Sequence, residues 1–145
     1  SYDPIVVAEH SITRMAVTNE KDADKERTMG RKYTVPYALY CARGFVSPQL
    51  AAQTGFSEED LELFWEALLN MFEYDRSAAR GLMTARRLVI FKHNSPLGNA
   101  SAESLFERVV CRKNDGVSTP RAFGDYRITL DGAPLTEVKK VVAVG

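Results

Sequence analysis

Two segments near the start of the chain have the residue pattern of paired β-strands. Ser11–Thr18 is rich in β-branched residues, and β character resumes from Thr28 to Val46. Between them, Asn19–Glu26 is almost wholly polar and charged, which is typical of a solvated tip. The pattern predicts a long hairpin, and Pro36, which cannot donate to a sheet ladder, marks where the hairpin joins the rest of the fold.

The most regular hydrophobic periodicity runs from about Ser57 to Tyr74 and predicts a helix. Ser57 is placed to act as the N-cap, with Asp60 three residues later as an approximate capping box and Phe56 before it as a hydrophobic staple. Apolar residues then recur at spacings of three and four, which places them on one helical face. They are Leu61, Phe64, Trp65, Leu68, Leu69 and Phe72. We expect this face to belong to the hydrophobic core.

The remainder of the chain predicts shorter elements. Arg86–Lys92 has a continuous apolar centre and predicts a strand, Ser101–Val109 a second helix, and Tyr126–Leu130 a brief strand. Val138–Val144 is either a final strand or a tail. A strand-rich hairpin followed by strand, helix and strand matches the second half of a βαββαβ ferredoxin-like domain.

The predicted fold class is therefore α+β, with one incomplete domain of the RRM or ferredoxin-like type. We expect the hairpin at about residues 9–36, a strand–helix–strand core at about 36–93 and a C-terminal extension over 94–145. The β-α-β first half of such a domain has no counterpart in the pattern.

Charge is segregated along the chain, although the formal net charge is zero. Residues 51–75 hold seven acidic and no basic side chains, whereas residues 76–113 hold eight basic and two acidic ones. A run of charge is usually a solvated face. The basic block is mostly Arg, however, whose planar fork suits phosphate, and it begins with small residues in DRSAARG. Two interpretations of this loop stay open, a phosphate-binding site and a solvated surface.

A second basic group lies in the predicted hairpin. It consists of Arg14, Arg27, Arg31 and Lys32, with Met15 and Met29 nearby. Met usually fills gaps in a core, but on a protruding hairpin an apolar side chain can wedge between bases. Tyr33, Tyr37 and Tyr40 are able to stack on bases, although tyrosines in strands are more often ordinary packing residues.

Several classes of function lack their sequence signals. Cys41 and Cys111 have no CxxC spacing, which argues against a structural zinc site and a disulfide scaffold and indicates a cytoplasmic location. No apolar run approaches the ~20 residues needed to span a bilayer. The chain has no P-loop, dinucleotide-binding or nucleophile-elbow motif, and its two histidines, His10 and His93, are isolated. We expect no enzymatic activity, no cofactor and no metal.

Three stretches in combination resemble the CRISPR-associated Cas7 family. They are SITRMAVTNEKDADKERTMGRKYTVPYALYCARGF, GFSEEDLELFWEALLNMFEYDRSAARG and RRLVIFKHNSPLGNA. The resemblance runs from about Pro4 to Leu130 and is to the backbone subunit of the type I-C Cascade complex (the Csd-two group), specifically to its C-terminal half. The chain departs from that group at Ala38, where Gly is common, and at Cys41, where a basic residue is common, so position 41 is not expected to contact RNA.

The resemblance implies a non-catalytic protein that polymerises along a CRISPR RNA and supports the pairing of this guide with target DNA. Its implied partners are the CRISPR RNA, target DNA through the guide, copies of itself and other Cascade subunits, with no membrane. The hairpin Ser11–Val35 would be a thumb that folds over the RNA. The candidate RNA-binding residues are Arg14, Met15, Met29, Arg31 and Lys32 in the thumb, and Arg76, Ser77 and Arg80 for backbone phosphates.

Two alternative functions stay open. One is a ferredoxin-like endoribonuclease that processes repeat RNA with His93, or with a tyrosine beside a basic residue. The other is a protein–protein assembly module that does not contact RNA. In the RNA-binding interpretation the acidic helix faces away from RNA, where it is solvated or pairs with the basic stretch of a neighbouring subunit.

Overall fold

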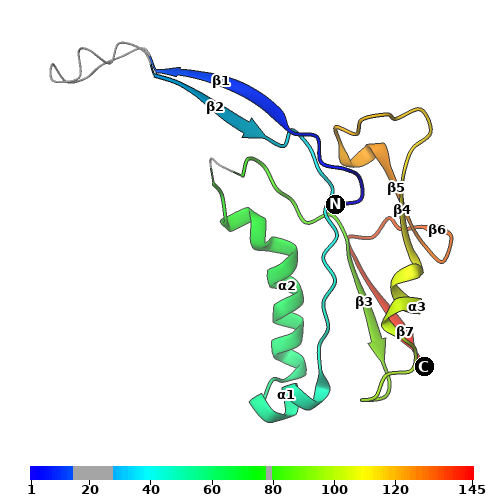
Figure 1. The fold of residues 1–145 in the computed structure, drawn as a ribbon. Helices are drawn as coiled ribbons and strands as arrows, with labels where there is room; N and C mark the ends of the chain where they lie inside the picture. Colours follow the sequence, from blue (N-terminus) through cyan, green and yellow to red (C-terminus); the bar gives the residue numbers. More distant parts are fainter. Residues whose placement is uncertain (15–27, 78–79) are drawn as a thin grey trace, which may run out of the picture. The chain divides into compact units, whose positions relative to one another are not determined.

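The computed structural model describes residues 1–14, 28–77 and 80–145. Its contacts divide the chain into two compact units, Ser1–Ala42 with Cys111–Arg127, and Arg43–Val110 with Ile128–Gly145. The described residues form three α-helices and three small sheets (Figure 1). This confirms the α+β class, while the assignment to half of an RRM or ferredoxin-like domain stays a prediction.

The predicted hairpin pairing is confirmed for the described residues. Strands β1 (Ala8–Arg14) and β2 (Thr28–Thr34) run antiparallel over their whole lengths, from Ala8 opposite Thr34 to Arg14 opposite Thr28 (Figure 1). The predicted tip at residues 19–26 lies outside the described residues. Strand β2 ends at Thr34, so the prediction of β structure as far as Val46 was wrong. Pro36 gives the reason, because it has no N–H with which to extend the ladder.

A short helix, which the sequence analysis missed, follows the irregular segment after the hairpin. Helix α1 (Pro48–Thr54) has Ser47 as its N-cap, and the Ser47 hydroxyl accepts a hydrogen bond from the Leu50 N–H at 3.4 Å. Gly55, at φ 73°, ends the helix in the left-handed conformation that glycine favours. Ser before Pro at the start and Gly at the end are the sequence signals that could have revealed α1.

The main helix begins where the sequence predicts. Helix α2 (Glu58–Tyr74) carries the capping box: the Ser57 hydroxyl accepts from the Asp60 N–H at 3.1 Å, and the Ser57 N–H donates to Asp60 Oδ2 at 2.8 Å. The Ser57 backbone N–H also holds the pKa of the Asp60 carboxyl below its ordinary value. The carboxylate at the third helical position therefore stays ionised at the positive end of the helix dipole.

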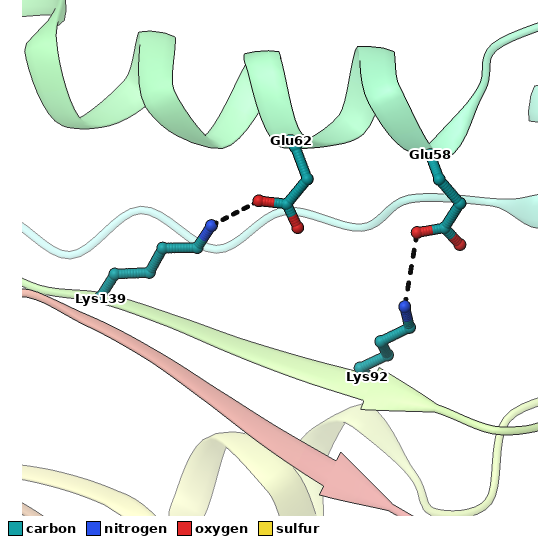
Figure 2. Close-up of polar contacts among 4 residues, drawn as sticks. All are labelled: Glu58, Glu62, Lys92 and Lys139. Atoms are coloured by element: carbon teal, nitrogen blue, oxygen red, sulfur yellow. Dashed lines mark hydrogen bonds and ion pairs between the residues drawn. The ribbon is translucent and has the colours of Figure 1, made fainter.

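Helix α2 is tied by two ion pairs to a parallel two-stranded sheet. Strands β3 (Leu88–His93) and β7 (Lys139–Val144) pair in register, so the C-terminal segment is a strand and not a tail. Lys92 Nζ of β3 lies 3.4 Å from Glu58 Oε2, and Lys139 Nζ of β7 lies 2.7 Å from Glu62 Oε2. Figure 2 shows both glutamates directed toward these lysines. Both glutamates lie on one face of α2, four residues apart, and thus face the sheet together.

The prediction that the apolar face of α2 forms the core was wrong. No residue of α2 is buried, and Phe64 is 44% exposed. Among the described residues, the buried apolar side chains are Leu105, Tyr126 and Leu135. Two neighbouring strands are only about 5 Å apart, whereas a helix with its side chains is about 10 Å across. The β3–β7 sheet is therefore too narrow to cover the apolar face of α2.

The C-terminal part contains a second short helix and a three-stranded sheet. Helix α3 (Ala102–Glu107) was predicted, as was β5 (Tyr126–Leu130), whereas β4 (Val109–Lys113) and β6 (Ala133–Pro134) were not. The sheet order is β4-β5-β6, and the 3-10 turn η2 (Phe123–Asp125) precedes β5. Asp131 and Gly132, at φ 52° and 81°, form the tight turn between β5 and β6, which is the Asp-Gly hairpin signal that the sequence analysis left unused.

Candidate nucleic-acid interface

The hairpin divides its candidate contacts between two faces. Successive side chains of a strand point to opposite faces of the sheet. Met29, Arg31 and Tyr33 therefore share one face of β2, whereas Lys32, which lies opposite His10, belongs to the other. An RNA strand that crosses one face of the hairpin would meet either the first three residues or Lys32.

The face with Met29, Arg31 and Tyr33 combines apolar, aromatic and cationic groups in solvent. Met29 is 75% exposed and Tyr33 60%. The Arg31 Nε atom lies 3.2 Å from Glu9 Oε1, in an ion pair whose two side chains are largely exposed. Exposed ion pairs are weak and exchange readily, so this pair does not prevent Arg31 from binding a phosphate. Arg14 is the last residue of β1, and Met15 lies outside the described residues.

The loop after α2 that contains Arg76 and Arg80, which we call the basic loop, forms ion pairs with the C-terminal end of that helix. The two terminal nitrogens of Arg80 donate to the two carboxylate oxygens of Asp75, each at 2.7 Å. Arg76 contacts Glu73 twice, through Nη2 to Oε2 and Nε to the backbone oxygen, both at 3.3 Å. The Arg80 guanidinium keeps the pKa of Asp75 below its ordinary value, and Asp75 raises the pKa of Arg80. A phosphate that binds Arg80 must therefore compete with a carboxylate that is ionised at neutral pH.

The backbone of this loop makes a tight turn at the third candidate, Ser77. The Arg80 N–H donates to the Ser77 carbonyl at 3.1 Å, and Ser77 forms an isolated bridge with Gly81. Gly81 has φ 64°, and a Cβ added there would meet no atom within 4 Å. The turn thus leaves open space beside the backbone, and glycine relieves the strain of a positive φ.

Ion pairing within the chain is the main feature that the sequence analysis missed. Four carboxylates of the acidic segment pair with cations of the same chain: Glu58 with Lys92, Glu62 with Lys139, Glu73 with Arg76 and Asp75 with Arg80. Only the spacing of three between Glu73 and Arg76 is a local signal that could have been read. The acidic helix is therefore compensated in part by its own chain, without a neighbouring subunit.

The groups considered for ribonuclease chemistry have structural partners. His93 Nδ1 accepts a hydrogen bond from the Asn99 N–H at 2.9 Å, which fastens the turn after β3. The Tyr126 hydroxyl donates to Asp3 Oδ2 at 2.7 Å, and Lys113 Nζ lies 3.3 Å from Asp3 Oδ1. Burial, reinforced by this hydrogen bond, raises the pKa of Tyr126. The phenol is thus held in its protonated form, which does not suit a general base.

Residues 1–14, 28–77 and 80–145 contain neither a metal-binding cluster nor a membrane-spanning helix. In these ranges the His, Cys, Asp and Glu side chains do not gather in groups of three or more that could hold a metal ion. None of the helices in the same ranges combines the length and the apolar character needed to cross a bilayer.

Comparison with known proteins places most of the chain in a protein family. Residues 1–131 match the family model described as CRISPR-associated protein Cas7. The matched range contains the hairpin, both short helices, α2 and the basic loop. No functionally curated protein matches the chain.

Proposed function

Because this chain belongs to the CRISPR-associated protein Cas7 family, we propose that it is a CRISPR RNA-binding, non-catalytic backbone subunit of a type I-C Cascade complex. The family match over residues 1–131 is the observation that carries the proposal. Membership implies a Cascade backbone role with CRISPR RNA as the ligand, in a family whose members are generally non-catalytic. The type I-C assignment, polymerisation along the guide and support of target DNA pairing extend this role and rest on the sequence resemblance.

In this proposal the β1–β2 hairpin is the thumb that folds over the RNA. Support comes from the exposure of Met29 and Tyr33 beside Arg31 on one face, where an apolar wedge, a stacking ring and a cation are accessible together. A two-stranded hairpin is at best marginally stable alone in water. Binding of RNA against this face would add the contacts that the hairpin lacks.

The basic loop supplies the contacts to backbone phosphates. A protein that holds guides of varying sequence must bind phosphates without reading bases, and arginines meet that requirement. Arg76 and Arg80 are more than 40% exposed, and their ion pairs with Glu73 and Asp75 are exchangeable. RNA would therefore replace carboxylate partners that hold the loop in the absence of ligand.

The proposal is tested by RNA binding as a function of salt. We expect the chain to bind two single-stranded guides of unrelated sequence with similar affinity. The affinity is measured by fluorescence anisotropy at salt concentrations from about 50 to about 200 mM. Each phosphate neutralised on a single strand contributes about −0.7 to the slope of log K against log salt. The Arg76→Ala/Arg80→Ala variant should lose up to about 1.4 of that slope, because the carboxylate partners reduce what the two arginines contribute. Equal binding by variant and unmodified chain at low and high salt would show that the phosphate assignment is wrong.

The ribonuclease alternative is separated by a cleavage assay. Labelled repeat RNA should stay intact when it is incubated with the chain, with and without divalent metal. Metal-independent cleavage that His93→Ala abolishes would overturn the non-catalytic part of the proposal. His93 fastens a turn through Asn99, so circular dichroism of His93→Ala must first show an unchanged fold.

A further inference from the structure

A cluster of two aromatic rings and one guanidinium lies outside both parts of the proposed interface. The Phe45 and Phe106 ring centroids are 5.7 Å apart, with the rings inclined at 64°. The Arg43 guanidinium carbon lies 5.1 Å from the centroid of the Phe106 ring. All three residues belong to the unit that contains Arg43–Val110. We call this cluster the Phe45 platform.

The platform offers its stacking groups to solvent. Phe45 is 76% exposed, and Arg43 is exposed beside it. Phe106 is half-buried and supports both residues. Phe45 lies on the irregular segment between β2 and α1, so its exposure is not a consequence of its place in a helix or strand.

Charge distinguishes the platform from the basic loop. Arg31, Arg76 and Arg80 each have a carboxylate partner, whereas Arg43 has no ion pair within the described ranges. The following stretch, residues 44–57, contains no charged residue. The cation of Arg43 is therefore balanced locally by the face of Phe106 and not by an acid.

These features favour a nucleic acid over an apolar protein surface. A protein partner that covered the cluster would have to desolvate Arg43 without a carboxylate, which is costly. A nucleotide provides both of the missing complements, because its base has a π-face for Phe45 and the planar guanidinium, and its phosphate is negative. Stacking of this kind tolerates any base, as a protein that holds variable guides requires.

We infer that Arg43, Phe45 and Phe106 form a stacking platform for a base of single-stranded RNA. The inference rests on the proposed function and adds a binding contact outside the hairpin and the basic loop. Its signature differs from that of a phosphate contact. Loss of stacking lowers affinity at every salt concentration, whereas loss of a phosphate contact changes the salt slope.

The test uses the whole chain and single-stranded RNA that carries 2-aminopurine at successive positions, because stacking on an aromatic ring quenches its fluorescence. We expect one or more positions to be quenched on binding. Phe45→Ala should relieve that quenching and weaken binding roughly 10-fold with an unchanged salt slope. Arg43→Lys, which keeps the charge but not the plane, should also relieve part of it. Leu50→Ala is the matched control, because Leu50 is an exposed apolar residue of α1 outside the platform.

Each outcome of this test either supports or overturns the Phe45 platform. Quenching that Phe45→Ala removes and Leu50→Ala retains supports the platform. RNA binding by the unmodified chain that Phe45→Ala leaves equally tight and equally quenched overturns the platform while the proposed function stands. A change confined to self-association in sedimentation, with RNA affinity intact, likewise overturns it and assigns the cluster to a protein interface. Failure of the unmodified chain to bind RNA overturns the platform and the proposed function together.

Discussion

Replacing Asp75 by Asn is expected to strengthen RNA binding, because this carboxylate competes with phosphate for Arg80. The two terminal nitrogens of Arg80 both donate to Asp75 at 2.7 Å. Arg80 holds the pKa of Asp75 below its ordinary value, so the competing charge persists at neutral pH and at mildly acidic pH. The Asp75→Asn substitution removes that charge and leaves the guanidinium available. The asparagine also suits the position, since the Asp75 backbone ends α2 through a hydrogen bond to Met71.

The size of the effect follows from counterion release. An Arg80 that is free to neutralise one phosphate contributes about 0.7 to the slope of log K against log salt, and competition by Asp75 reduces this contribution in the unmodified chain. Asp75→Asn restores the full contribution, whereas Arg80→Ala removes it, so the slopes of these two variants should differ by about 0.7. Over a fourfold change in salt, this difference in slope corresponds to about a threefold change in affinity. The Asp75→Asn/Arg80→Ala double variant should match Arg80→Ala, because Asp75 acts only through Arg80.

The assay is fluorescence anisotropy with labelled single-stranded RNA over a salt series, and Glu137→Gln is the matched control. Glu137 also forms an ion pair at 2.7 Å, with Lys140, but it lies two residues before β7 and outside the proposed interface. We expect Glu137→Gln to leave the slope unchanged. An equal change in Asp75→Asn and Glu137→Gln would mean that net charge alone governs binding. An unchanged slope in Asp75→Asn would refute the assignment of Arg80 to phosphate.

Three further predictions concern the fold that positions the interface. Ser57→Ala should lower the free energy of unfolding by about 1 kcal/mol in urea titrations followed by circular dichroism, because it removes the side-chain half of the α2 capping box, and retained stability in Ser57→Ala would contradict the cap. Leu105→Ala should lower the free energy of unfolding by about 2–5 kcal/mol, because Leu105 is only 5% exposed. The exposed control Leu50→Ala should lower it by less than about 0.5 kcal/mol. Equal losses of unfolding free energy in the two variants would show that Leu105 does not belong to the core. In a Cys41→Ser variant, alkylation of Cys111 should be slow near neutral pH and should accelerate as the pH approaches about 11. The reason is that burial raises the pKa of the Cys111 thiol to about 11, and the thiolate is the reactive form. Rapid alkylation at neutral pH would argue against the burial of Cys111.

The sequence by itself determined the elements whose signals are local. Ser57 and Asp60 predicted the start of α2, and the structure places the capping box there. The apolar run in β3 and the extent of β5 were also readable, because strand and helix periodicity depends on neighbours a few residues away. Local signals for α1 and for the Asp131–Gly132 turn were present too and were not used.

Only the tertiary structure decided which segments meet. The parallel pairing of β3 with β7, the ion pairs of α2 with both strands and the edge contact of Phe45 with Phe106 join residues more than thirty positions apart. No local window encodes such partners, because they depend on chain reversal and on the area available for burial. The apolar face of α2 shows the difference: its periodicity predicted a buried surface, but no residue of α2 is buried, and the neighbouring β3–β7 sheet has only two strands. Arg80 shows the same difference. The residue type indicates a phosphate contact, because a guanidinium suits phosphate. Only the structure shows that Asp75 pairs with Arg80 and would compete with that phosphate.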